Sequence, residues 1–134
     1  DNFNSLDFST WKHDITMGGG GNNEFQLYQN NRTNSFIKNG TLYLYPTFTA
    51  NNPDEVSHML NDMEVNLYGT DPPADCTSNA FGGCWKKSDP NSGAMVNPIR
   101  SAAIRSIDSF TIKYGKIEVR ARMPSGDWLW PAIW

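Results

Sequence analysis

The chain has 134 residues, a size typical of one domain, although all-β sandwiches often need roughly 200–250 residues. Charged residues make up 19% of the chain and the formal net charge is −3, so it lacks the basic field that binds nucleic-acid phosphates. No apolar run approaches the roughly 20 residues of a membrane-spanning helix, so neither nucleic acid nor membrane is an expected partner.

The first third of the chain predicts β-strands. Residues 24–29 alternate between polar and apolar side chains and predict one strand. Residues 35–38 and 41–45 flank the dipeptide Asn39-Gly40. Asn-Gly supplies the two positive φ values of a type I′ turn, so this segment predicts a β-hairpin.

One helix is predicted, over residues 53–60. Asn52 is a good capping residue, Pro53 suits the first helical position, and two acids follow in the first turn. A strand is expected at residues 63–67, followed by a long irregular loop from about 69 to 97. Loops of this length tend to be functional or held by a cross-link.

The two cysteines of the chain, Cys76 and Cys84, lie within this loop. A disulfide between them would stabilise the fold by roughly 2.5 kcal/mol in the chain-entropy model. Zinc binding is the alternative, but two thiols with no other cysteine or histidine nearby make a poor zinc site. Glycosylation sequons begin at Asn31 and Asn39 and, with the disulfide, indicate a secreted, extracellular protein.

Three more strands are predicted towards the end of the chain, at residues 99–107, 110–114 and 115–123. In the last of these, every second side chain is apolar, at Ile117, Val119, Ala121 and Met123. Such a strand lies in an antiparallel sheet with one face buried and its charged face solvated. The chain is therefore predicted to be all-β.

Several kinds of catalytic or binding site are not supported. The run Gly18–Gly21 lacks the Lys-Ser/Thr of a P-loop and the spacing of a dinucleotide fingerprint. The two histidines, His13 and His58, are far apart, have no second metal ligand nearby, and are expected to be surface or capping residues. Ser-His-Asp catalysis has no nucleophile elbow from which to start.

Tryptophans are concentrated in the last eleven residues, 124–134. Trp128 and Trp130 share parity along an extended chain, which would point both to the same face. Flat indole faces in a groove can hold sugar rings through the apolar patches of those rings. The alternative is that the tryptophans fill the core, and Trp134 is the one most expected to be buried.

Several parts of the chain together match segments of one known family. They are Phe3, Leu6 and Trp11; Gly20–Gln26; Pro72-Pro73; the Cys76–Cys84 loop; Asn97-Pro98; Tyr114–Pro124; and Gly126–Trp134. These segments resemble glycoside hydrolase family 16, and in particular its invertebrate branch. That branch contains β-1,3-glucanases (laminarinases) and the glucan-recognition proteins related to them.

The resemblance implies a two-sheet antiparallel jelly-roll sandwich of the concanavalin A-like type, incomplete in this chain. Residues 1–134 would be the N-terminal portion of a single domain, and the expected partners are the remaining C-terminal half of that domain and a β-1,3-glucan. The family's concave face forms an open cleft for the polysaccharide. No cofactor is predicted; a structural calcium ion occurs in parts of the family, but this sequence reveals no site for it.

The resemblance implies an endo-β-1,3-glucanase that hydrolyses laminarin-type glucans by a retaining double displacement. The family's two catalytic glutamates lie in a Glu-x-Asp-x-x-Glu pattern, which is absent here and expected beyond Trp134, so no catalytic residue is assigned. The alternative is a non-catalytic β-1,3-glucan-recognition protein of innate immunity, in which those glutamates are replaced. Retention of family cleft residues favours the enzyme.

The residues carried over from the family concern substrate binding. Asn22 matches an asparagine that the family places at the cleft, and Trp130 and Trp134 match tryptophans that line or support its central subsites. Trp128 matches the invertebrate branch alone and is assigned as an additional sugar platform. The family commonly has arginine where this chain has Ala103. Arg105 is assigned because it lies two residues further along the predicted strand, which would place its side chain on the same face.

Overall fold

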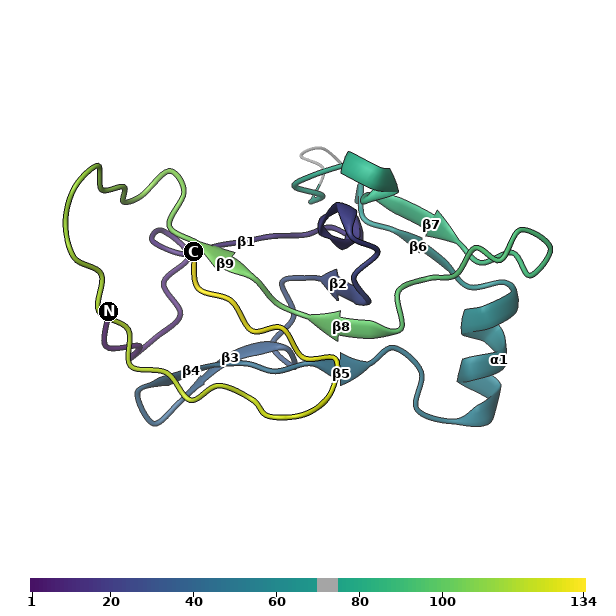
Figure 1. Ribbon diagram of the computed structural model, residues 1–134, viewed down its shortest axis with the longest axis horizontal. Coiled ribbons are helices and arrows are strands. Elements are labelled where there is room, and N and C mark those ends of the chain that lie inside the picture. Colours follow the sequence, from purple (N-terminus) through teal and green to yellow (C-terminus); the bar gives the residue numbers. More distant parts are fainter. Residues whose placement is uncertain (70–74) are drawn as a thin grey trace.

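A computed structural model describes residues 1–69 and 75–134 and contains an all-β sandwich fragment with one α-helix (Figure 1). The predicted all-β class is confirmed. The segment Pro72-Pro73, part of the family resemblance, lies outside the described residues. The elements are β1 (Lys12–His13), η1 (Gly19–Gly21), β2 (Gln26–Tyr28), β3 (Ser35–Lys38), β4 (Thr41–Leu44), β5 (Thr47–Phe48), α1 (Pro53–Asn61), β6 (Glu64–Asn66), η2 (Ala80–Gly82), β7 (Trp85–Lys87), β8 (Ile99–Ser101) and β9 (Ile104–Arg105).

The central sheet has three strands in the order β2-β8-β5. Strand β8 pairs with β5 in the antiparallel sense and with β2 in the parallel sense, with Gln26 opposite Ile99. The parallel pairing differs from the antiparallel strands that the sequence predicts. Leu27, in the middle of β2, is only 2% exposed and belongs to the core.

The β3–β4 hairpin is formed as predicted. Lys38 lies opposite Thr41, and the two turn residues between them have positive φ, 52° at Asn39 and 69° at Gly40. Positive φ at both positions is what a type I′ turn requires, and Asn and Gly tolerate it best. The hairpin is therefore specified by its own local sequence.

A buried asparagine joins this hairpin to the central sheet. Asn34 is 1% exposed, and its Nδ2 donates to the carbonyl of Tyr45 at 2.8 Å and to Thr47 Oγ1 at 3.0 Å. The same amide lies 3.2 Å from the carbonyl oxygen of Arg100, at the centre of β8. Because a buried amide is costly unless its hydrogen bonds are satisfied, these contacts fix the two sheets relative to each other.

Helix α1 is confirmed and extends to Asn61. The side chain of Asn52 accepts a hydrogen bond from the backbone N–H of Glu55 at 2.9 Å, and Pro53 occupies the first helical turn. The helix lies at the end of the molecule opposite the N-terminus (Figure 1). No helix in the described part of the chain is long and apolar enough to cross a membrane.

The segment predicted as an irregular loop, residues 69–97, contains regular structure where it is described. Strand β7 pairs antiparallel with β6, with Glu64 opposite Lys87 and Asn66 opposite Trp85. The prediction was wrong here because three residues are too few for a two-residue period to be recognised. This pairing places residues 64–66 beside residues 85–87, so the two ends of the intervening segment lie next to each other.

Residues 107–134 are exposed throughout, and the strands predicted at 110–114 and 115–123 are not formed. The predicted strand 99–107 is divided into β8 and β9. Ile117 is 65% exposed and Met123 is 49% exposed, although their alternation predicts burial. A strand needs a neighbouring strand for its backbone hydrogen bonds, and no described segment pairs with 115–123.

The prediction that His13 lies on the surface or caps a helix is wrong. Its side chain is 6% exposed, and its Nε2 is hydrogen-bonded to Ser35 Oγ at 2.8 Å. The Phe8 ring lies 5.9 Å from the imidazole between centroids, and the Arg32 guanidinium lies over Phe8. His13 therefore connects β1 to the start of the hairpin.

Candidate functional site

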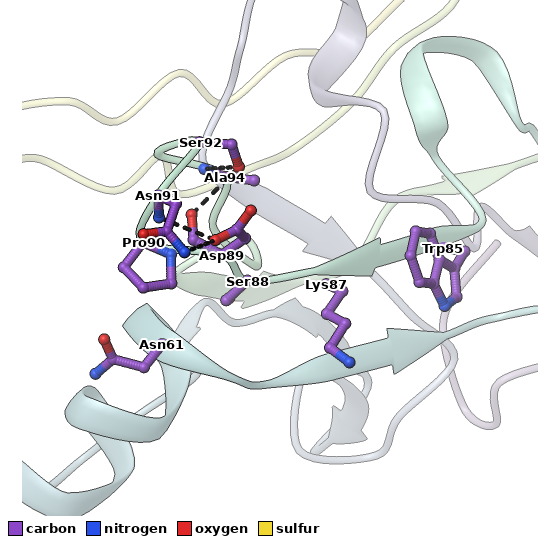
Figure 2. Close-up of a pocket in the computed structure, with 9 residues that line it drawn as sticks. All are labelled: Asn61, Trp85, Lys87, Ser88, Asp89, Pro90, Asn91, Ser92 and Ala94. Carbon is purple, nitrogen blue, oxygen red and sulfur yellow. Dashed lines mark hydrogen bonds between the residues drawn. The ribbon is translucent and has the colours of Figure 1, made fainter.

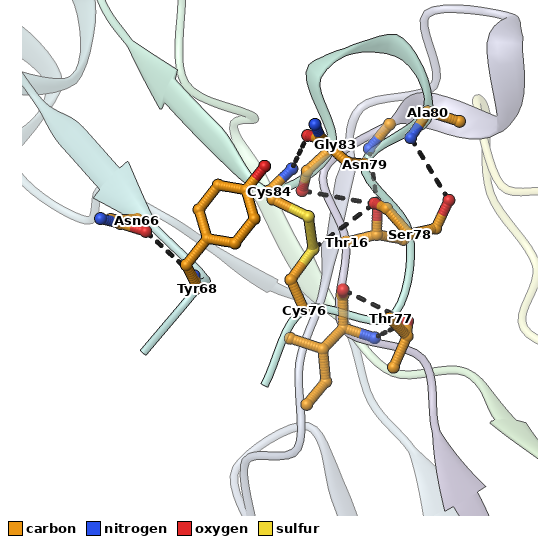
Figure 3. Close-up of a disulfide and its surroundings, with 12 residues drawn as sticks. Thr16, Asn66, Tyr68, Cys76, Thr77, Ser78, Asn79, Ala80, Gly83 and Cys84 are labelled. Carbon is orange, nitrogen blue, oxygen red and sulfur yellow. Dashed lines mark hydrogen bonds between the residues drawn. A yellow bond between two sulfur atoms is a disulfide. The ribbon is translucent and has the colours of Figure 1, made fainter. Parts of the chain in front are cut away.

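The predicted disulfide between Cys76 and Cys84 is present (Figure 3). The two Cα atoms lie 5.6 Å apart, within the usual range for a disulfide. The cross-link closes a short loop, called here the disulfide loop (residues 76–84), which contains η2. Within the described residues no cysteine is free, so the alternative of thiolate zinc binding does not apply.

The disulfide loop is hydrogen-bonded along residues 15–17 (Figure 3). The backbone N–H of Thr77 donates to the carbonyl of Ile15 at 2.9 Å, and Thr77 Oγ1 accepts from the N–H of Ile15 at 2.9 Å. At the other end of the loop, the N–H of Met17 donates to the carbonyl of Gly83 at 2.7 Å. The loop is thus held at both ends against the segment that precedes η1.

Two glycines allow this close approach. A Cβ atom at Gly83 would lie 2.2 Å from Thr16 Oγ1, and one at Gly18 would lie 2.6 Å from the carbonyl oxygen of Ala80. Both distances are shorter than any stable non-bonded contact. The backbones of the disulfide loop and the glycine turn (residues 18–21) therefore pack directly against each other.

A hollow of about 330 Å³ lies between the glycine turn, the disulfide loop and residues 93–98. Its volume is at the lower end of the roughly 300–1,000 Å³ of small-molecule pockets, enough for a small part of a polymer. Two phenyl rings line it, Phe25, which is 56% exposed, and Phe81, which is 73% exposed. Both rings therefore present apolar surface to an occupant of the hollow.

The polar side of the hollow is built around Asn97, which is 4% exposed. Its Nδ2 donates to the carbonyl of Gln26 at 2.8 Å, and its Oδ1 accepts from Lys86 Nζ at 2.7 Å. Burial lowers the pKa of Lys86. An ammonium has three donors, so Lys86 retains N–H groups for a ligand hydroxyl.

Glu24 lines the hollow beside the glycine turn, and the side chain of Asn22 lies next to it. Asn22 Nδ2 lies 3.4 Å from Glu24 Oε1, and the other carboxylate oxygen of Glu24 accepts from Gln26. Asn22 is exposed and does not itself line the hollow, whereas its neighbours Gly21 and Asn23 do. Its role in ligand binding stays a prediction.

Arg105 lies elsewhere, in the two-stranded β1–β9 sheet. One of its guanidinium nitrogens is 2.6 Å from Asp14 Oδ1. Burial raises the pKa of Asp14, and the positive charge of Arg105 opposes that effect. Arg105 is thus already paired with a carboxylate, and it does not line the hollow.

The three assigned tryptophans are all exposed. Trp128, Trp130 and Trp134 are 92%, 69% and 99% exposed, so the expectation that Trp134 is buried is wrong. Trp128 has a φ of 66°, within a turn, so the chain is not extended there and the parity argument for a shared face does not hold. Among the described residues, no hydrogen bond or aromatic contact joins these tryptophans to the hollow.

A second hollow, of about 580 Å³, lies between the end of α1, strand β7 and the turn at residues 88–94 (Figure 2). Trp85 lines it, with its indole N–H donated to Glu64 Oε1 at 2.9 Å. Several polar groups of the turn bond to one another, since Asp89 Oδ1 accepts from both the backbone and side-chain N–H of Asn91. Although larger, this hollow is open and offers one aromatic ring, so the first hollow is the stronger candidate.

Sequence analysis missed Phe25, Phe81 and Asn97 as candidate site residues. The usable signal was an aromatic residue, Phe81, between two cysteines and directly before Gly82-Gly83. The sequon asparagines lie on exposed turns: Asn31 Oδ1 accepts from the N–H of Thr33 at 2.8 Å, and Asn39 begins the β3–β4 turn. Within residues 1–69 and 75–134, no group of three His, Cys, Asp or Glu is placed to hold a metal ion.

Comparison with known proteins supplies relatives for this chain. It is 45% identical over 135 residues to a beta-1,3-glucan-binding protein of Penaeus monodon, covering 100% of this chain and 36% of the relative. It is 34% identical to beta-1,3-glucan-binding protein 1 of Manduca sexta, covering 99% of this chain and 26% of the relative. The chain is homologous to β-1,3-glucan-binding proteins.

A bacterial enzyme is a more distant relative. The chain is 28% identical to glucan endo-1,3-beta-glucosidase A1 of Niallia circulans, covering 100% of this chain and 16% of the relative. The chain thus spans about a third or less of the length of these three relatives. No family model matches it, and no solved structure matches it.

Proposed function

We propose that this chain binds a β-1,3-glucan and that the hollow beside the disulfide loop receives part of the polysaccharide. One observation carries the proposal: in a chain 45% identical to a named glucan-binding protein, Phe25 and Phe81 line a hollow that also contains Asn97 and Lys86. Phenyl faces complement the apolar faces of a sugar ring. Amide, carboxylate and ammonium groups complement its hydroxyls.

The charge of the chain fits an uncharged polymer. The net charge is −3, and the ionic groups at the hollow, Glu24 and Lys86, are of opposite sign. The hollow is too small for more than a short part of a glucan, so the rest of the polymer would extend over the surface. We assign Asn22, Arg105, Trp128, Trp130 and Trp134 as further contacts along that path.

Calorimetric titration of the intact protein with laminarin tests this function. We expect saturable binding of laminarin and none of dextran, whose α-1,6 linkages present the rings differently. Equal binding of both polymers, or binding of neither, would contradict the assignment to β-1,3-glucan.

The aromatic contact assigned to Trp128 gives a separate prediction. We expect Trp128→Ala to weaken binding of laminari-oligosaccharides by about 1–3 kcal/mol, the range measured for aromatic stacking on nucleobases. Trp85→Ala is the matched control, because Trp85 is also an exposed tryptophan but lines the other hollow. Unchanged affinity in a folded Trp128→Ala protein would remove Trp128 from the binding surface.

Hydrolysis is the second candidate function, favoured by the 28% identity to glucan endo-1,3-beta-glucosidase A1 along the whole of this chain. Under this proposal the protein is an endo-β-1,3-glucanase whose two glutamates, about 5–5.5 Å apart, follow Trp134 and act by retaining double displacement. The C-terminal half of the same domain would then complete the site. Release of reducing sugar from laminarin faster than a buffer blank would support hydrolysis, and its absence would favour a binding protein.

We further propose that the protein is secreted. Disulfides persist in oxidising compartments, and both sequon asparagines are exposed. N-glycans at Asn31 or Asn39 would be removed by peptide N-glycosidase F, with a corresponding loss of mass. A natural protein without any such mass change would argue against glycosylation at both sites.

A further inference from the structure

Phe81 has an unusual backbone conformation for an aromatic residue. Its φ is 54° and its ψ is 34°, which lie in the left-handed region. This conformation costs residues other than glycine roughly 1–2 kcal/mol. Its neighbour Gly82 also has positive φ, 71°. The surrounding structure has to offset this cost, and residues in such conformations are frequent at ligand-binding sites.

The surroundings that enforce this conformation are the two ends of the disulfide loop. The N–H of Gly83 donates to the carbonyl of Ala80 at 3.1 Å, which closes the turn around Phe81. The N–H of Cys84 donates to Asn79 Oδ1 at 3.2 Å. The disulfide and the hydrogen bonds to residues 15–17 then hold this turn against the body of the molecule.

The Phe81 ring has a seat on the opposite wall of the hollow. A Cβ atom at Gly21 would lie 3.0 Å from two carbon atoms of the ring, tighter than an ordinary van der Waals contact, so the ring lies directly against this glycine. The side chain nevertheless remains 73% exposed. One part of the ring is therefore fixed against the glycine turn, while most of it is presented to solvent and the hollow.

We propose that Phe81 is a specificity-determining platform for the sugar ring and that the Cys76–Cys84 disulfide is its positioning device. This inference rests on the proposed function. A flat ring favours gluco-configured units, because their equatorial substituents leave only C–H groups on both faces. A manno-configured unit carries an axial hydroxyl at C2, which disrupts one of those faces.

Calorimetric titration of the intact protein with laminari-, cello- and manno-oligosaccharides tests the platform. We expect Phe81→Ala to lower affinity for gluco-configured ligands by about tenfold and to reduce the preference over manno-oligosaccharides. Phe81→Tyr should retain both properties. The matched control is Phe48→Ala, since Phe48 is 67% exposed on β5 but does not line the hollow.

The positioning role is tested by removing the cross-link. Dithiothreitol supplies two electrons and two protons, converts the disulfide to two thiols and itself becomes a cyclic disulfide; Cys76→Ser with Cys84→Ser has the same structural effect. We expect either treatment to weaken binding as much as Phe81→Ala does. We expect no further loss when the two changes are combined, because both act through the same ring.

Each outcome separates this inference from the proposed function. Wild-type affinity and preference in Phe81→Ala would overturn the platform, and full binding after reduction would overturn the positioning role. If the serine variant does not fold, as judged by far-UV circular dichroism, Phe81→Ala and Phe81→Tyr still decide the platform. A third outcome separates the two proposals: the wild type binds cello-oligosaccharides but not laminarin, and Phe81→Ala loses the cello-oligosaccharide binding. This result would reject β-1,3-glucan as the ligand but support Phe81 as a sugar platform. Binding of no sugar by wild type would overturn both.

Discussion

Individual glycines determine how closely the disulfide loop approaches the rest of the chain. Gly83 has a φ of −67°, which any residue adopts, so its importance is spatial and not conformational. Gly21 has a φ of 78° and also borders the Phe81 ring, so it is needed for both reasons. The shape of the hollow therefore depends on positions 21 and 83 having no side chain.

We expect Gly83→Ala to lower the free energy of unfolding by about 1–3 kcal/mol, as overpacking does in cores. The added methyl group would meet Thr16 Oγ1 at 2.2 Å and two backbone oxygens, at Ser78 and Ala80, within 3.0 Å. Urea denaturation measures the loss. Gly93→Ala is the reference for backbone strain alone, because its Cβ would meet no atom within 4 Å but its φ is 73°, which costs roughly 1–2 kcal/mol for a non-glycine residue. Gly83 carries no such strain, so unchanged stability in Gly83→Ala would show that close packing at this position does not matter.

Single residues also mark the limit of sequence analysis for the site. The disulfide was predictable because two cysteines with no other ligand nearby have few alternatives. Phe81 was not, because neither its left-handed φ nor its exposure is specified by its sequence neighbours. Asn97 was not, because its contacts come from Lys86 and Gln26, which lie on other segments.

At the scale of elements, local chemistry explains which predictions were confirmed. The Asn39-Gly40 turn and the Asn52 cap act within a few residues, so the hairpin and α1 could be predicted. The β2–β8 and β6–β7 pairings join distant segments of only three residues each, too short for a periodic pattern. Strand pairing of this kind is fixed by tertiary contacts and not by propensity.

The predicted strand at 115–123 shows the converse. Its alternation of apolar and charged side chains is regular, yet Val119 is 55% exposed and the segment is unpaired among the described residues. Pattern specifies which face a strand can bury, but burial also requires a partner surface.

The cap of α1 gives an element-scale prediction. We expect Asn52→Ala to lower stability by about 1 kcal/mol, because the N–H of Glu55 loses its side-chain acceptor. Faster amide hydrogen exchange in the first turn of α1 should accompany the loss. Asn51→Ala is the control. The backbone N–H of Asn51 donates to Glu55 Oε2, and this hydrogen bond does not involve the Asn51 side chain. If both variants exchange like wild type, the cap does not stabilise the helix.

At the scale of the whole molecule, we expect His13 to contribute to acid sensitivity. Its Nδ1 is buried without a hydrogen-bond partner among the described residues. Burial, and secondarily the charge of Arg32, lowers the pKa of His13 below its ordinary 6.5. The unfolded chain therefore binds a proton more readily than the folded one. We therefore expect the stability that neutral His13 contributes to be fully present above pH 6.5 and to be lost as pH falls from 6.5 through the lower folded pKa.

We expect the melting temperature of the wild type to fall between about pH 7.5 and about pH 5.5, and to fall less in His13→Gln, which cannot take up a proton. Hydrogen bonds, chiefly from Ser9 and Thr10, lower the pKa of Asp7 to about 2. Because protonation of Asp7 changes stability only below its ordinary pKa of 3.8, Asp7 does not contribute between about pH 7.5 and about pH 5.5. Scanning calorimetry at the two pH values makes the comparison. An equal decrease in both proteins would assign the acid sensitivity to other groups.

The position of β8 has a consequence for biosynthesis. As the middle strand, it contacts β2 on one edge and β5 on the other, yet it follows both in the chain. During translation, both earlier strands leave the ribosome before their shared neighbour exists, whereas the β3–β4 hairpin can close as soon as residue 44 emerges. Until residues 99–101 are released, the nascent polypeptide carries two unpaired strand edges, and such edges are prone to pair with other chains.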